Sequence, residues 1–176
     1  MDRRSALKYI GVASAVAFIL PSCVSDPKKV SIALNNLKIT GDEEELLAEL
    51  AGVLIPKTET PGAKEVGAHH FLLVMVDDCL STEEQQKFLR GMRAFNEEVK
   101  KRTGGSILKG TAAERTAALT KVHAERDSLT EDVKTFYQVS RNYIIQGYTS
   151  SQHFLTEIKP YKHVPGPIFR GCAPLS

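Results

Sequence analysis

The residues of this sequence best suited to chemistry are the adjacent pair His69-His70 and the acidic pair Asp77-Asp78, about two helical turns later. Imidazole and carboxylate groups bind metals and act as general acids and bases. Neighbouring residues of a helix, however, point about 100° apart, and helical metal pairs are usually three or four positions apart. We therefore interpret His69 and His70 as structural residues at the edge of a buried helix. The alternative is a metal or acid–base site that includes Asp77.

No other pattern points to catalysis or to a bound cofactor. The sequence lacks the G-x-G-x-x-G turn of dinucleotide-binding folds, the G-x-x-x-x-G-K-[ST] phosphate loop and the C-x-x-C-H haem motif. The histidines at 123, 153 and 163 are isolated, and Ser140 and Ser151 have no evident base nearby in the sequence. We expect a non-catalytic chain that holds no cofactor and no metal of its own.

The N-terminal segment has the organisation of an export signal. Arg3, Arg4 and Lys8 precede an apolar run at 9–20, which is shorter than the roughly 17–25 residues of a membrane-spanning helix. The arginine pair, followed closely by an apolar residue and a lysine, resembles a twin-arginine export signal. The alternative is an ordinary secretion signal with a basic start. Residues 1–22 are predicted to be cleaved, and the mature protein to lie on the periplasmic side of the cell envelope.

The apolar run ends at Cys23, and the small residue just before this cysteine resembles the lipidation site of bacterial lipoproteins. Each buried methylene of an acyl chain adds about 0.8 kcal/mol of membrane affinity, so lipid on Cys23 would anchor the chain without spanning the bilayer. Residues 23–41 are then a lipid-anchored tether. The alternative is an unanchored periplasmic protein with an ordinary cysteine at this position.

The charge of the predicted mature chain gives no reason to expect a nucleic-acid partner. The 176-residue chain carries a net charge of +2, and the predicted signal contains two more basic than acidic residues, so the remainder is close to neutral. A basic tract that could bind phosphates is absent from the sequence. The remaining length suits a single domain with a hydrophobic core.

Two cysteines remain if Cys23 is lipidated. Cys79 and Cys172 then form an even pair in an oxidising compartment, where a disulfide that closes so long a loop contributes about 2–4 kcal/mol. The alternative is two separate thiols, since their distance in space cannot be read from the sequence.

Hydrophobic periodicity and capping signals predict an all-α protein. Ser81 with Glu84 and Thr111 with Glu114 match the capping box that begins a helix, whereas Pro56, Gly104 and Gly147 are predicted ends. A short buried strand is the alternative for the apolar run at 71–76. The result is a single domain of about five helices at 42–150, followed by an extended irregular tail at 151–176 that packs on the domain or on a partner. The predicted helices lie within residues 40–56, 63–80, 81–105, 111–127 and 129–148.

Three stretches of the chain resemble the gluconate 2-dehydrogenase subunit 3 family, the small subunits of membrane-associated flavin dehydrogenases. They are LAGVLIPKTETPGAKEVGAHHFL, DVKTFYQVSRNYIIQGYTS and YKHVPGPIFRGCAP, and the resemblance covers about residues 43–174. It implies that turn and aromatic positions in these stretches contact a partner subunit. These positions are Pro56, Pro61, Gly62, Tyr148, Tyr161, Pro165 and Gly166.

The resemblance also implies the kind of complex to which the chain belongs. The expected partner is a large flavoprotein of the glucose–methanol–choline type, which binds FAD and oxidises a sugar, a sugar acid or a polyol. A cytochrome c subunit is a further expected partner, and the small subunit supports maturation and export. Two other hypotheses are an independent enzyme that uses His69, His70 and Asp77, and a free-standing structural lipoprotein of the envelope.

Overall fold

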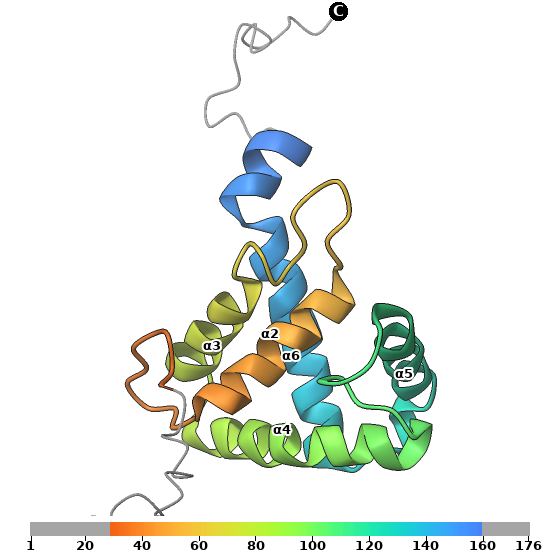
Figure 1. Ribbon diagram of the computed structural model, residues 1–176. Helices are drawn as coiled ribbons and strands as arrows, with labels where there is room; N and C mark the ends of the chain where they lie inside the picture. Colours follow the sequence, from red (N-terminus) through yellow and green to blue (C-terminus); the bar gives the residue numbers. More distant parts are fainter. Residues whose placement is uncertain (1–28, 160–176) are drawn as a thin grey trace, which may run out of the picture.

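The computed structural model describes residues 29–159, and this part of the chain is helical (Figure 1). It contains no strand within the described range, so the predicted all-α class is confirmed. The run at 71–76 lies inside a helix, and the alternative of a buried strand is therefore wrong. The elements are α2 (Gly41–Leu54), α3 (Ala68–Cys79), α4 (Thr82–Thr103), α5 (Ala112–Ala124), the 3-10 turn η1 (Arg126–Ser128), α6 (Glu131–Thr149) and the π-helical turn η2 (Phe154–Ile158).

Capping boxes fix the beginning of three helices. The predicted boxes at the starts of α4 and α5 are both present, with each hydroxyl accepting from the N–H three residues on and each glutamate accepting from the cap N–H. Thr40 and Glu43 form a third box at the start of α2. These bonds satisfy N–H groups that a helix cannot pair internally, which is why the starts are well defined.

Helix α3 begins later than the sequence analysis predicted. Residues 63–67 form tight turns in place of a first helical turn, and Ala68 N donates to Ala63 O at 2.9 Å. Gly67 then adopts a left-handed conformation with φ 72°, which a side chain would disfavour, and α3 follows directly. The histidine pair is therefore in the first turn of α3 and not in its interior.

The core lies where α6 packs against α4 and α3. Phe136 of α6 stands between Phe88 and Phe95 of α4, with ring centroids 5.1 Å apart in both pairs, and all three side chains are fully buried. Gly91 of α4 allows the close crossing, because a Cβ there would lie only 2.0 Å from Asp132 O. Figure 1 shows α3 and α5 on opposite sides of α6, with α2 crossing in front of it. None of the helices in residues 29–159 is both long enough and apolar enough to cross a membrane.

Helix α6 does not end at Gly147, as predicted, but continues to Thr149. Gly147 is buried against α3, and a Cβ on it would lie 2.9 Å from Cβ of Phe71. Its role is thus close helix packing. The chain beyond Ser150 also begins with a helical turn and not with the predicted irregular tail, since η2 spans Phe154–Ile158 and Lys159 N donates to Phe154 O at 2.8 Å.

The segment before α2 is packed onto the helices over most of its described length. Leu37 is buried, and Ile32, Leu34 and Ile39 are partly buried against the core. The predicted tether at 23–41 is thus shorter than expected, because its second half belongs to the helical domain.

Candidate functional site

The predicted partner-binding residues that the structure describes gather at one end of the domain. Pro56, Pro61 and Gly62 lie in the loop between α2 and α3, and Tyr148 lies in the last turn of α6. The Tyr148 hydroxyl donates to Pro61 O at 3.3 Å, and the ring of Phe154 in η2 meets the Tyr148 ring edge-on at 5.7 Å. We call the loop at 56–62, the last turn of α6 and η2 the loop–α6 end; it lies at the top of Figure 1.

Glycine is required at position 62 by the close approach of the loop to itself. A Cβ on Gly62 would lie 2.6 Å from Ile55 O and 2.6 Å from Lys57 N, both backbone atoms. This fold-back lets Ala63 N donate to Ile55 O at 2.9 Å, and Ala63 is fully buried. The loop is therefore a defined structure that presents an exposed rim at residues 56–60.

These residues differ in what they could offer to another protein. Gly62 and Tyr148 are buried and organise the loop, whereas Pro56 is exposed and Pro61 is half-buried. Tyr161, Pro165 and Gly166 lie outside the described residues, as do Arg3, Arg4, Cys23 and Cys172. Cys79 is exposed at the last position of α3, and its pairing with Cys172 stays a prediction.

The structure separates Asp77 from the histidine pair. The buried Asp77 carboxylate accepts three consecutive backbone N–H groups, from Asn35 at 2.7 Å, Asn36 at 2.8 Å and Leu37 at 2.6 Å. Burial alone would raise the pKa of Asp77, but these hydrogen bonds outweigh it and lower the pKa below its usual value. The metal or acid–base site with Asp77 that was the alternative interpretation is therefore not formed.

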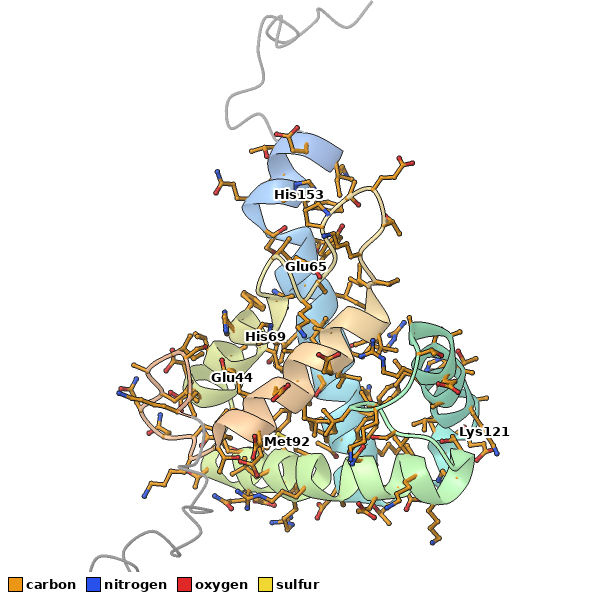
Figure 2. All side chains as sticks on the ribbon, in the orientation of Figure 1. Glu44, Glu65, His69, Met92, Lys121 and His153 are labelled. Carbon is orange, nitrogen blue, oxygen red and sulfur yellow. The ribbon has the colours of Figure 1, made fainter. Side chains whose placement is uncertain are left out.

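The carboxylate that lies next to the histidines is that of Glu44 in α2, and not that of Asp77. One ring nitrogen of His69, one of His70 and one carboxylate oxygen of Glu44 lie within 4.8 Å of one another. Ser31 N donates to Glu44 Oε2 at 2.8 Å, and the Ser31 hydroxyl contacts both Glu44 Oε1 and His70 Nε2. Figure 2 shows Glu44 and His69 close together between α2 and α3. We call Glu44, His69 and His70 the His–Glu cluster.

The electrostatics of the His–Glu cluster keep Glu44 ionised and His69 neutral at neutral pH. Burial tends to raise the pKa of Glu44, but the hydrogen bonds from Ser31 and the neighbouring His70 outweigh it and lower the pKa. Burial lowers the pKa of His69 to about 4, with His70 contributing in the same direction and Glu44 opposing it. Sequence reasoning missed Glu44, because it lies on another helix and no spacing relates it to position 69.

The surface hollows add no catalytic set within the described residues. One hollow of about 660 Å³ between the end of α4 and α5 is lined by lysines, glycines and small residues, with Glu114 as its acid. A second of about 310 Å³ contains His123 and Tyr137, whose Nδ1 and hydroxyl lie 3.2 Å apart. Burial raises the pKa of this Tyr137, so its hydroxyl stays protonated and is a poor nucleophile.

Fold and site together define a small all-α domain whose distinctive feature is an organised loop packed on the end of a long helix. The model of the family described as gluconate 2-dehydrogenase subunit 3 matches residues 41–166, and the chain belongs to this family. The match contains the described helices from α2 to η2, and with them the loop–α6 end. No curated protein and no solved structure matches the chain.

Proposed function

We propose that this chain is the non-catalytic small subunit of an FAD-dependent dehydrogenase of the glucose–methanol–choline type. The complex oxidises a sugar, a sugar acid or a polyol on the periplasmic side of the cell envelope. The observation that carries the proposal is the family match over residues 41–166, since that family is named as a subunit of a dehydrogenase. FAD belongs to the large subunit, and a cytochrome c subunit receives the electrons.

The N-terminal sequence supports a role in export of the complex. Flavin is inserted into a folded protein, and the twin-arginine route carries folded cargo. A flavoprotein without its own signal can therefore leave the cytoplasm bound to a subunit that carries Arg3 and Arg4. Lipid on Cys23 then attaches the exported complex to the membrane.

The loop–α6 end is the proposed docking region for the flavoprotein. Hydrogen bonds within the loop brace the rim at 56–60, such as that from Thr58 N to Thr60 O at 3.1 Å, and a preformed surface loses less conformational entropy on binding. Tyr161, Pro165 and Gly166 follow η2 along the chain and are proposed to extend the same contact.

Shared export gives the sharpest test. The chain is co-expressed with a candidate flavoprotein subunit from the same organism that has no export signal of its own, and both proteins are quantified in cytoplasmic and periplasmic fractions together with their FAD content. Replacing Arg3 and Arg4 by Lys should retain both chains in the cytoplasm, because lysine keeps the charge but not the paired guanidinium groups. Replacing Lys28 and Lys29 by Arg, which alters two adjacent basic residues outside the predicted signal, is the matched control and should leave export unchanged.

Two results would contradict the proposal. Export of the flavoprotein that is unaffected by the Arg3 and Arg4 substitutions would exclude shared transport. Purification of the wild-type chain from membranes without any flavoprotein would favour a free-standing structural lipoprotein instead.

A further inference from the structure

The His–Glu cluster has the types of side chain and the spacing of ligand atoms that are typical of a metal site. Two imidazoles and one carboxylate present ligand atoms within 4.8 Å of one another. The rings of His69 and His70 lie side by side with centroids 4.0 Å apart, and His70 Nε2 is 3.2 Å from Glu44 Oε1. Since Zn–N and Zn–O bonds of about 2.0–2.2 Å place tetrahedral ligands about 3.4 Å apart, a modest contraction would form the site.

A second observation concerns a buried polar atom. His69 is only 8% exposed, and its Nδ1 has no hydrogen-bond partner among the described residues. Buried polar atoms without a partner are uncommon and costly in folded proteins, and coordination to a metal ion would satisfy this nitrogen. The ring is neutral, which is the form of imidazole that binds metals.

We propose that Glu44, His69 and His70 bind one divalent transition-metal ion of the Zn²⁺ type. Imidazole nitrogens favour Zn²⁺ and its neighbours over Mg²⁺ and Ca²⁺, which prefer an all-oxygen shell. Three protein ligands leave one position for water or for the Ser31 hydroxyl, which already lies 3.0 Å from His70 Nε2.

The ion would act as a cross-link between parts of the fold. Glu44 belongs to α2, the histidines belong to the first turn of α3, and Ser31 precedes both helices. These elements are joined here by polar contacts near the surface, where His70 is partly exposed. A bound ion would fix the start of α3 and the adjacent turns at 63–67, which join it to the loop at 56–62.

The test is metal binding by the full chain. The protein is purified in detergent, stripped with a chelator and titrated with ZnSO₄ by calorimetry, and Co²⁺ is used as a spectroscopic probe of the coordination. We expect one equivalent of Zn²⁺ to bind and to raise Tm, and Co²⁺ to give the visible absorption of a four- or five-coordinate site. His69→Gln, His70→Gln and Glu44→Gln should each weaken binding about tenfold or more.

Two controls separate this site from adventitious binding. Glu45→Gln changes an exposed carboxylate adjacent to Glu44, and His123→Gln changes a histidine in another part of the fold; both should bind Zn²⁺ like the wild type. Far-UV circular dichroism identifies any variant that fails to fold, and such a variant is left out of the comparison. Among the folded variants, His69→Gln and Glu44→Gln are the decisive ones. Absence of Zn²⁺ binding by the wild type, or undiminished binding by His69→Gln, would overturn the proposal. All readouts are independent of the dehydrogenase partner, so the outcome does not depend on the proposed function.

Discussion

At the scale of single residues, Asp77 anchors the segment before α2. Its two carboxylate oxygens accept from three consecutive N–H groups, and its own carbonyl oxygen accepts from Asn36 Nδ2 at 3.1 Å and from Gln85 Nε2 at 3.0 Å. These hydrogen bonds favour the charged carboxylate, which explains why Asp77 is ionised although it is only 3% exposed.

Replacing Asp77 by Asn should destabilise the protein. Asparagine has a single acceptor oxygen, so at least one backbone N–H would face the NH₂ group and stay unpaired at a buried position. We expect the free energy of unfolding to fall by about 2–4 kcal/mol at pH 7, measured by urea denaturation. The control is Asp78→Asn, an exposed neighbour whose replacement should change stability by less than about 0.5 kcal/mol.

The same variant predicts a pH dependence. The pKa of Asp77 is lowered on folding, so the ionised carboxylate stabilises the native state above its unfolded pKa of about 3.9. This contribution is lost as pH falls from about 4 through the lower folded pKa. The stability difference between wild type and Asp77→Asn should therefore shrink on acidification across that range, and a constant difference would contradict the assignment.

The roles of individual polar residues could be predicted only in part. His69 and His70 were recognisable as metal-ligand types, but their third neighbour, Glu44, lies 25 positions earlier. Asp77 was considered only as an alternative partner of the histidines, and its actual contacts could not be predicted, because a carboxylate that accepts backbone N–H groups of a loop has no characteristic sequence spacing. Such contacts depend on tertiary geometry, not on spacing.

At the scale of elements, the crossing of α4 and α6 organises the domain. The two helices share the largest contact in the described structure, and the crossing is close because Gly91 has no side chain. Phe136 packs one turn further along α6 than Asp132, whose carbonyl oxygen faces Gly91. The absence of a Cβ at Gly91 thus determines how closely the two helices can approach each other.

Gly91→Ala should be among the most damaging single substitutions in the chain. A Cβ would lie 2.0 Å from Asp132 O and 2.7 Å from Phe136 Cβ, and neither atom can move without shifting a helix. We expect a loss of about 3 kcal/mol or more, measured by urea denaturation, despite the better helix propensity of alanine. Gly105→Ala is the matched control, since its Cβ would meet only ordinary contacts at 3.5 Å and beyond. Equal stabilities of the two variants would show that the crossing can relax.

Element boundaries were predictable where the signal is local. The capping boxes at Ser81 and Thr111 each involve residues three apart, so their sequence pattern already contains the whole interaction. Gly147 was misjudged as a helix end because the reason for the glycine, the ring of Phe71 on α3, lies 76 positions away. Glycine thus has two different roles in this chain. Gly104 ends α4 with φ 72°, whereas Gly147 lies inside α6 and allows it to pack closely on α3.

At the scale of the whole molecule, the described chain has two ends of different character. The segment at 31–40, which Asp77 anchors near the end of α3, lies away from the loop–α6 end at the top of Figure 1, whereas the His–Glu cluster lies at the start of α3, next to the loop. The all-α class of the described residues followed from hydrophobic periodicity and capping signals. The residues of the loop–α6 end were predicted only from the family resemblance. Periodicity carries no information on the contact between a proline–glycine loop and a tyrosine far away in the sequence.

Membrane attachment can be tested on the whole chain. Cys23→Ala removes the proposed lipid acceptor and should move the protein from the membrane fraction to the soluble fraction after gentle lysis, as measured by immunoblotting. Cys79→Ala, which alters a cysteine inside the helical domain, should leave the protein in the membrane fraction. Retention of the Cys23 variant would mean that a contact other than lipid holds the protein there.

If Cys23 carries lipid, as proposed, the contact of Ser31 with Glu44 also limits how far the helical domain can lie from the lipid bilayer. Only eight residue steps separate Cys23 from Ser31, and an extended chain advances at most about 3.6 Å per step. An acyl group on Cys23 would therefore confine Ser31 to a layer about 30 Å deep beside the bilayer surface. Inserting or deleting residues between these two positions would change the depth of that layer in proportion, without altering any contact inside the helical domain.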